Sequence, residues 1–336
     1  MIVLALLAVA QPPAGVAVTK SETTLTFTVG GRPATTYQYA GDVQQEKGDG
    51  RKPLAKPFFY PLTAPNGAAV TRGWPMARGT AGETTDHFHQ KSVWFCHGDV
   101  EPGWLKLATK SADGRPGAAN FWTEAAGHGR IVCVSVGEPV ADGPGRLTVP
   151  TRNEWRTADG VKLLDESRVL TVSDHGAGVL LALDITLTAS EGPVTFGDTK
   201  EGAMGVRVHD ELRTQVKSGG VVTSSDGGTS TAAKDNLPMW GKGADWHDYS
   251  GTVGGKAAGL AVFDHPHNQP RAAWHTRAYG LMAANPFGRA KSGFPLYAGK
   301  TDLVTLAKGE SLRLRYAVYA HDGDVTAGKV AEVFAK

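Results

Sequence analysis

Cysteine is scarce in this chain, because Cys96 and Cys133 are the only two among 336 residues. Two cysteines cannot build a disulfide-rich scaffold, and no Cys-x-x-Cys pair is present to suggest a zinc ribbon. Both stand in apolar runs. The residues therefore leave two alternatives open, a disulfide formed in an oxidising compartment and a pair of buried thiols.

An excess of charge of one sign is also missing. The chain has 35 Lys and Arg against 33 Asp and Glu, and its formal net charge is +2. Proteins that bind nucleic acid carry a basic patch or stripe, so we expect no nucleic-acid partner. No apolar run beyond the N-terminus approaches the roughly 20 residues that a membrane span requires, so we expect no span. The sequence lacks a Gly-x-Ser-x-Gly elbow and a phosphate-binding P-loop, which leaves serine esterases and nucleotide enzymes without support.

The first ten residues, MIVLALLAVA, are apolar and end in small-x-small spacing before QPP. This pattern is typical of a signal peptide and its cleavage site, although a basic segment before it is missing. We therefore expect residues 1–17 to be the remnant of a signal peptide and residues 18–336 to form a single domain. The expected location is periplasmic or extracellular, and a strand of the core is the alternative for the N-terminal segment.

Short strand-like segments make up most of the chain. They cover residues 25–29, 93–97, 131–136, 146–156, 179–189, 260–265 and 312–321, each bounded by Gly, Pro, Asn or Asp. Alternation with period two and frequent turns predict an all-β fold, a large two-sheet β-sandwich. Residues 324–336 have helical spacing and predict one short C-terminal helix. The Gly-, Ser- and Thr-rich stretch 216–236 predicts a surface excursion or hairpin inside the same domain.

Histidines gather in the segment TTDHFHQKSVWFCHGDV, residues 84–100. If residues 86–89 are extended, His87 and His89 point to the same face of a strand. Such a His-x-His pair is suited to bind a divalent metal ion, and Asp86 could orient one ring or bind the metal itself. Histidines that only form hydrogen bonds are the alternative. Lys91 and Trp94 follow in the same segment as candidate substrate contacts.

Two other segments combine polar and aromatic residues. Residues 246–251, 263–280 and 284–288 have the composition of a ligand site on loops that a rigid sheet positions. A loop pinned only by side-chain hydrogen bonds would have a similar composition. The third segment, FGDTKEGAMGVRV (196–208), begins with a sharp Gly-flanked bend. There Glu201 could be a general base or metal ligand, and Lys200 could bind an anionic group. Glu124 is interpreted as structural.

These motifs, together with RPATTYQYAGD and FFYPLTAPNGAAVTRGWPM, resemble the bacterial family labelled PmoA-like, or "methane oxygenase PmoA", a domain of unknown function. The resemblance extends from about Thr24 to His321. The family pattern Asp-His-Pro-His-His corresponds to residues 86–90, where Phe88 and Gln90 depart from it. A methane monooxygenase subunit spans the membrane, and this chain shows no span, so methane oxidation is not implied. More loosely, the expected fold resembles the β-supersandwich of galactose mutarotase-like proteins.

The resemblance implies a role with carbohydrates, because members of the family look like secreted proteins encoded among sugar-catabolic enzymes. We expect an exported carbohydrate-active enzyme that hydrolyses, eliminates or epimerises a sugar, with a divalent metal ion as the cofactor that the histidines suggest. One alternative is a non-catalytic glycan-binding protein, and another is a metal-dependent oxygenase. The three segments are expected to lie together. The candidate catalytic residues are His87, His89, Glu201 and His275, the candidate metal ligands are His87 and His89, and the candidate substrate contacts are Lys91, Trp94, Lys200, Trp246, Asp264, His265, Trp274, Arg277 and Asn285.

Overall fold

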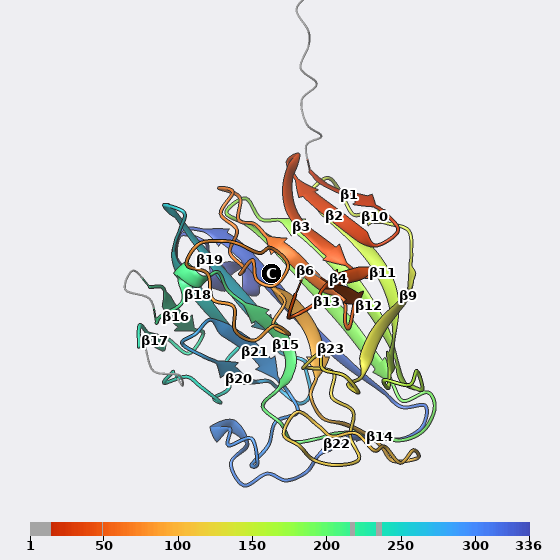
Figure 1. Cartoon of the computed structure of the whole chain (residues 1–336). Helices are drawn as coiled ribbons and strands as arrows, with labels where there is room; N and C mark the ends of the chain where they lie inside the picture. Colours follow the sequence, from red (N-terminus) through yellow and green to blue (C-terminus); the bar gives the residue numbers. More distant parts are fainter. Residues whose placement is uncertain (1–14, 49, 216–218, 233–236) are drawn as a thin grey trace, which may run out of the picture.

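The computed structural model describes residues 15–48, 50–215, 219–232 and 237–336. Two large antiparallel sheets pack against each other (Figure 1). The eight-stranded sheet has the order β1 (Val16–Lys20), β2 (Thr24–Val29), β3 (Arg32–Gln38), β6 (Phe58–Leu62), β7 (Val93–His97), β15 (Gly202–Arg207), β21 (Leu281–Asn285) and β20 (Ala273–Thr276). The all-β, two-sheet prediction is therefore confirmed.

The ten-stranded sheet forms the other layer. Its order is β10 (Val140–Ala141), β11 (Arg146–Arg156), β12 (Lys162–Asp174), β13 (Gly178–Thr188), β23 (Ser311–Asp322), β19 (Lys256–Asp264), β18 (Trp246–Val253), β16 (Val221–Ser224) and β17 (Thr229–Ser230), and β9 (Arg130–Val136) also pairs with β11. A small sheet joins β22 (Val304–Leu306), β14 (Val194–Phe196) and β8 (Val100–Pro102), and a hairpin joins β4 (Asp42–Gln44) to β5 (Arg51–Pro53). Two short 3-10 helices cover Asp210–Leu212 and Pro295–Tyr297.

The ends of the chain and the Gly-rich stretch differ in part from the predictions. Of the predicted leader, residues 1–14 lie outside the described residues, while Val16 and Ala17 already pair with β2. The helix α1 covers only Val330–Phe334, because the Asp324 carboxylate accepts backbone hydrogen bonds that form a turn before it. The predicted hairpin within 216–236 is formed by β16 and β17. Residues 216–218 and 233–236 lie outside the described residues.

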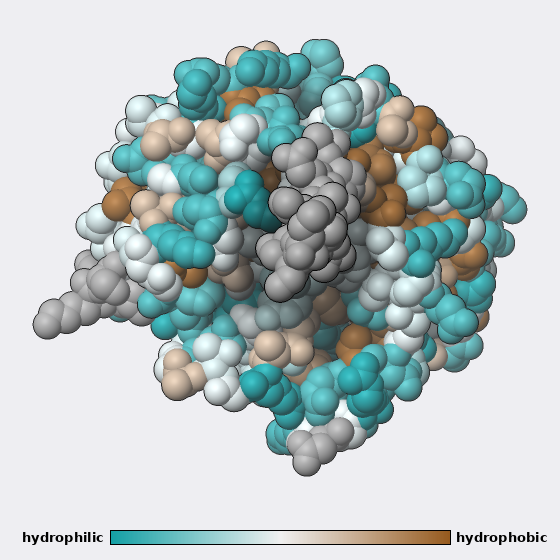
Figure 2. All heavy atoms as spheres, turned by 90° about the horizontal axis from the view of Figure 1, so that it is seen from above, coloured by the Kyte–Doolittle hydropathy of each residue, from teal (hydrophilic) through white to brown (hydrophobic). Residues whose placement is uncertain are grey.

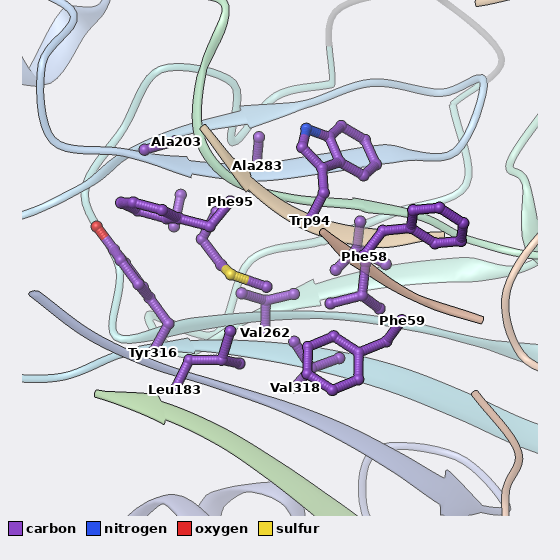
Figure 3. Close-up of a cluster of buried hydrophobic side chains, with 14 of the residues drawn as sticks. Phe58, Phe59, Trp94, Phe95, Leu183, Ala203, Val262, Ala283, Tyr316 and Val318 are labelled. Atoms are coloured by element: carbon purple, nitrogen blue, oxygen red, sulfur yellow. The ribbon is translucent and has the colours of Figure 1, made fainter. Parts of the chain in front are cut away.

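The core lies between the two sheets. On β13 the alternate side chains of Leu181, Leu183 and Ile185 are buried, as period-two patterning requires. Figure 3 shows part of this packing, with Leu183 beside Tyr316, its partner on β23. Full burial of each such side chain contributes about 2 kcal/mol. The outside of the molecule is different, because Figure 2 shows a face where hydrophilic residues predominate and hydrophobic ones form small separate patches. None of the described helices is long and apolar enough to cross a membrane.

The simple alternation fails in the middle of the eight-stranded sheet. All residues of β7, β15 and β21 are buried, including those on the face away from the core. The outer face is therefore covered in this region by the loops around residues 84–92 and 120–124. Cys96 on β7 is buried and Cys133 is partly buried, and both are free thiols.

Candidate functional site

A transverse row of residues crosses the outer face of the eight-stranded sheet. Directly opposed residues in neighbouring antiparallel strands share a face of the sheet, and the register gives one such row across six strands. In strand order the row is Gln38, Phe58, Trp94, Gly205, Ala283 and His275. Figure 3 shows Trp94 and Ala283 on the side of the strands that faces away from the core.

The segment that carries the first two histidines is a turn, so the extended conformation considered for residues 86–89 is not the one present. His87 has a φ of 46°. The carbonyl of His87 accepts a hydrogen bond of 2.9 Å from the backbone N–H of Gln90. Phe88 is buried in this turn beneath Trp74, whose ring centroid lies 6.4 Å from its own. The turn nevertheless leaves the rings of His87 and His89 only 5.9 Å apart.

Asp86 orients His87, as the sequence suggested it could. The Nδ1 atom of His87 lies 3.1 Å from Oδ2 of Asp86, while Oδ1 of the same carboxylate accepts from Arg72 at 2.5 Å and from Arg207 at 2.8 Å. Both arginines are fully buried. Burial acts to raise the pKa of Asp86, but the hydrogen bond with His87 and the two guanidinium charges hold it well below its usual range. Asp86 is therefore a fixed anion behind His87.

An aromatic ring joins the first histidine to the loop after β20. The ring of His87 stacks on Tyr279, with centroids 4.9 Å apart and planes 6° from parallel. The guanidinium groups of Arg207 and Arg277 lie 4.7 and 5.5 Å from the centroid of the same tyrosine ring. The predicted proximity of the 84–100 segment to the 263–280 segment is thus present in the structure.

His275 lies at the end of the transverse row, and the backbone fixes its tautomer. Its Nδ1 atom is 2.9 Å from the carbonyl oxygen of Lys200. A carbonyl only accepts, so Nδ1 carries the proton and Nε2 keeps its lone pair. Burial and the charge of Arg277, whose Nη1 lies 3.4 Å from Nε2, lower the pKa of His275 to about 3. The imidazole is therefore neutral, and its Nε2 lone pair accepts from Nη1 of Arg277.

Glu201 adds a carboxyl group to the same place. It directly follows Lys200 at the start of β15, and its backbone carbonyl accepts from Gly98 at 2.8 Å. Among the residues that the structure describes, its carboxylate makes no hydrogen bond or ion pair. Burial raises the pKa of Glu201, Asp113 adds to this effect, and the charges of Lys200, His87 and Arg277 oppose it. The three predicted segments therefore meet around His87, Glu201 and His275.

A buried charge cluster lies beside this site. Lys56 and Lys91 share the carboxylate of Glu124, with 2.8 Å between Lys56 Nζ and Oε1 and Lys91 paired to Oε2. Burial lowers the pKa of Lys91 to about 8. Burial alone would raise the pKa of Glu124, but the two lysines lower it to about 2. Burial and the charge of Lys56 lower the pKa of the neighbouring His89 to about 3, so this imidazole is neutral.

The histidines do not form a metal centre by themselves. Across residues 15–48, 50–215, 219–232 and 237–336, no group of three or more His, Cys, Asp and Glu side chains is placed to hold a metal ion. Nδ1 of His87 is already used by Asp86, and His89 lies against Trp122, with centroids 6.4 Å apart. A single pair of imidazoles without a third ligand does not fit the usual metal sites of proteins, so the predicted metal is not supported by the donor set.

The predicted tryptophan contacts lie inside the protein. Trp94 is only 1% exposed and packs on Trp122, with centroids 5.2 Å apart, over Gly205. Trp274 is buried on the core side and stacks on His247, and Trp246 is buried beside the C-terminal helix. None of the three can stack on a sugar in this structure. Their apolar area is used for packing, which is the commoner use of tryptophan in a sheet.

Three polar residues that were predicted to contact a substrate are bonded within the protein instead. The buried carboxylate of Asp264 accepts three hydrogen bonds from residues 268–272, so it closes its own loop. His265 begins that loop, and its backbone N–H donates to the carbonyl of Arg315 on β23 of the ten-stranded sheet. The buried Asn285 donates to the carbonyl of Thr199 at 3.0 Å and accepts from two backbone N–H groups, so it fixes the 196–202 bend. Asn285 therefore fixes the bend that precedes β15 and so helps to position Glu201.

Sequence reasoning missed several side chains of the site. Arg72 and Arg207, which hold Asp86, and Trp240, whose partly buried ring lies 6.3 Å from that of His275, were not identified. An arginine in the apolar strand GAMGVR was a usable signal, because a charged side chain in a fully buried strand needs a partner. Glu124, interpreted as structural, is the centre of the buried charge cluster.

Comparison with known proteins assigns the chain to a family. A family model matches residues 24–335, and the chain belongs to this family of unknown function, DUF6807. The narrower PmoA-like label stays a prediction. A comparison with curated protein sequences finds no match.

Several solved structures are similar in fold. The α-galactosidase from Lactobacillus brevis is 10% identical, with 93% of this chain and 40% of that chain covered and a TM-score of 0.41. The GH36 α-galactosidase AgaB from Geobacillus stearothermophilus is 8% identical, with 93% and 42% covered and a TM-score of 0.44. This chain thus spans about two fifths of these galactosidase chains. A galactose mutarotase related enzyme from Lactobacillus acidophilus is 9% identical, with 92% and 98% covered and a TM-score of 0.31.

Proposed function

We propose that the protein is a carbohydrate-active enzyme in which Glu201 is the general base and His87 the general acid for proton transfer on a sugar. The observation that supports this is the meeting, on one face of the sheet, of a carboxyl group with a raised pKa and an imidazole backed by a fixed carboxylate. A carboxylate with a raised pKa is a stronger base. The anion of Asp86 orients the ring of His87, whose imidazolium form is the one that donates a proton.

The neighbouring groups are suited to hold the sugar. His275 is neutral and does not act as a proton carrier; its Nε2 accepts from Arg277 or, when the sugar displaces that contact, from a hydroxyl group. Arg277 and Lys200 supply positive charge where negative charge develops on a sugar oxygen. Tyr279 supports the ring of His87 from behind. In this account His87 and Glu201 are catalytic and His275 is a binding residue.

An isomerisation or epimerisation fits these groups best. Glu201 removes a proton from the carbon beside the sugar carbonyl while His87 donates one to the carbonyl oxygen, which gives an enediol. Return of the proton from Glu201 to the other face of that carbon or to the neighbouring carbon, with loss of a hydroxyl proton to His87, completes the reaction and restores both groups. The paired carboxylates of ordinary glycosidases are a poorer fit, because Asp86 is held by two arginines. Hydrolysis is the second candidate, since the charge of Asp113 contributes to the raised pKa of Glu201 and marks a second carboxylate in the vicinity.

Export belongs to the proposal as well. It is supported by the apolar N-terminal run and its small-x-small ending. A non-catalytic glycan-binding protein and a metal-dependent oxygenase, the two alternatives from the sequence, are separated from the enzyme by the experiment that follows.

Turnover of sugars tests the proposal. The protein is incubated in D2O with a panel of free aldoses, uronates and oligosaccharides, and ¹H NMR follows each compound. We expect turnover of at least one compound, reduced by about 100-fold or more in His87→Gln and in Glu201→Gln. The matched control His267→Gln, an exposed histidine outside the site, keeps full turnover. Full turnover in Glu201→Gln would overturn the proposal.

The same panel separates the alternatives. A loss in Asp113→Asn as large as that in Glu201→Gln, with a new reducing end in the product, favours hydrolysis. Binding of a glycan without turnover in the wild type favours the glycan-binding protein. Oxidised products that require added iron or copper favour the oxygenase.

A further inference from the structure

A cavity of about 430 Å³ opens on the same outer face, beside the site. Gln38 and Phe58 of the transverse row line it, together with Asp42, Arg51, Arg78 and Lys91. It lies on the other side of the His87 turn, because Phe88 of that turn packs 4.6 Å beneath the ammonium group of Lys91. The cavity is therefore separate from the acid and base groups, and nothing in the proposed reaction uses it.

Two arginines of the cavity are bonded to backbone carbonyl oxygens. Arg51 donates to the backbone carbonyl of Asp42, and Arg78 donates to the carbonyls of Gly48, at 3.0 Å, and Gln45. Carbonyl oxygens orient a guanidinium group but do not neutralise it. Within the described part of the chain neither arginine has an ion pair. Among the described residues, the guanidinium groups are thus held in place by carbonyl oxygens and not by a carboxylate.

The third cation comes from the buried cluster behind the cavity wall. Lys91 shares the carboxylate of Glu124 with Lys56, and Lys52 Nζ lies 4.0 Å from Oε2 of the same group. Three ammonium groups therefore face one carboxylate, and the cluster has an excess of positive charge when they are protonated. Of the described residues that line the cavity, only Asp42 is acidic. An anionic ligand would reduce the electrostatic cost of bringing these cations together.

The transverse row fixes how far the cavity is from His275, the binding residue at the end of the row. Neighbouring strands are about 4.8 Å apart, so four spacings from Phe58 to His275 give about 19 Å and five spacings from Gln38 give about 24 Å. A single sugar ring cannot reach across this distance. A ligand that occupies both places must be an extended chain that passes over the His87 turn.

We propose that the cavity is a subsite for the anionic group of an oligosaccharide, a carboxylate or a sulfate on a sugar unit distant from the one that reacts. This inference rests on the proposed function, because it treats the oligosaccharide as the substrate of the enzyme. Its binding test does not depend on turnover. Arg51 and Arg78 hold the anion, and Arg guanidinium groups are well suited to carboxylate and sulfate oxygens because they donate in pairs. The enzyme would accordingly act on acidic glycans.

Binding of matched oligosaccharides by isothermal titration calorimetry tests the inference, with Glu201→Gln as the background so that no ligand is consumed. The probes are a galacturonate tetramer, its methyl ester and a sulfated tetrasaccharide. We expect the acidic probe of the correct kind to bind at least tenfold more tightly than the methyl ester. The preference should weaken at high salt. Tighter binding of the galacturonate identifies a carboxylate as the ligand, and tighter binding of the sulfated probe identifies a sulfate.

Variants then locate the binding. Arg51→Gln combined with Arg78→Gln should weaken binding of the acidic probe at least tenfold and leave binding of the methyl ester unchanged. Arg152→Gln, an exposed arginine on the other sheet, is the control and should change neither. Unchanged binding of the acidic probe in the double variant would overturn the subsite, and so would equal affinity for the acid and its methyl ester. If the wild type turns over no sugar but the acidic probe still depends on Arg51 and Arg78, the proposed reaction fails and the subsite stands.

Discussion

Nδ1 of His87 lies 3.1 Å from Oδ2 of Asp86, and two fully buried arginines hold the same carboxylate from the other side. This pair connects the stability of the sheet to the chemistry of the site. Removing the charge of Asp86 leaves Arg72 and Arg207 buried without their common partner. The same change removes the group that orients His87.

Asp86→Asn should therefore destabilise the protein. Breaking a buried ion pair costs about 3 to 5 kcal/mol, and the part-exposed Asp86 side chain (42%) reduces this to about 2 kcal/mol or more. Urea unfolding measures the change. Asp142→Asn removes an exposed partner of Arg146, at 3.8 Å, and should change the free energy of unfolding by less than about 1 kcal/mol. Equal effects of the two substitutions would show that Asp86 does not neutralise the buried arginines.

Glu201→Gln should stabilise the fold while it abolishes turnover. The folded state raises the pKa of Glu201, so the stability that this group contributes is complete at low pH and is lost as the pH rises through the raised pKa. The variant should gain about 1 kcal/mol at neutral pH and nothing near pH 3. Thermal unfolding at the two pH values measures this gain. Glu22→Gln, an exposed control, should show no such pH-dependent gain, and a destabilised Glu201→Gln would contradict the account.

The buried cluster predicts two changes of stability with pH. The pKa of Glu124 falls from 4.5 to about 2 in the folded state, so stability is lost as the pH decreases between these values. The pKa of Lys91 falls from 10.5 to about 8, so stability increases as the pH rises from about 8 to 10.5. Lys91→Met should remove the alkaline increase. Persistence of the increase in that variant would assign it to another group.

Glu124→Gln should be the most destabilising single change in this cluster. It leaves Lys56 and Lys91 buried without a carboxylate, at a cost of about 3 to 5 kcal/mol. Urea unfolding at pH 7 measures the change. The double variant Glu124→Gln/Lys56→Met should recover part of the loss, because Lys91 is then the one ammonium group of these pairs that stays fully buried, while Lys52 is part-exposed. No recovery would mean that the packing of Glu124, and not its charge, is what matters.

Gly205 and Trp94 should depend on each other. A Cβ atom at Gly205 would lie 2.5 Å from Cζ2 of Trp94. Gly205→Ala should therefore cost about 1 to 3 kcal/mol through overpacking. In a Trp94→Leu background the same substitution should cost less than about 0.5 kcal/mol. A double-mutant cycle measured by urea unfolding tests this coupling, and additive effects would contradict the packing described here.

The strands and part of the site could be predicted because their signals are local. Period-two alternation marked β11 and β13, and the polar bend at 198–201 was recognised from its flanking glycines. What could not be predicted depends on contacts between distant segments. Trp94 and Trp274 are buried because neighbouring strands and loops cover both faces of the sheet, and the His87 turn forms because Phe88 is buried against Trp74. Such contacts have no signature within one segment of the sequence.

The pH dependence of kcat/KM, for whichever sugar the wild type converts, tests the central claim most directly. We expect kcat/KM to fall at acidic pH as Glu201 is protonated, and this acidic limb should lie above the usual range of a carboxyl group because burial raises the pKa of Glu201. Glu201→Gln should remove the acidic limb, and Asp86→Asn should lower kcat/KM at every pH because His87 loses the carboxylate that orients its ring. An acidic limb that persists unchanged in Glu201→Gln would contradict the assignment of Glu201 as the base.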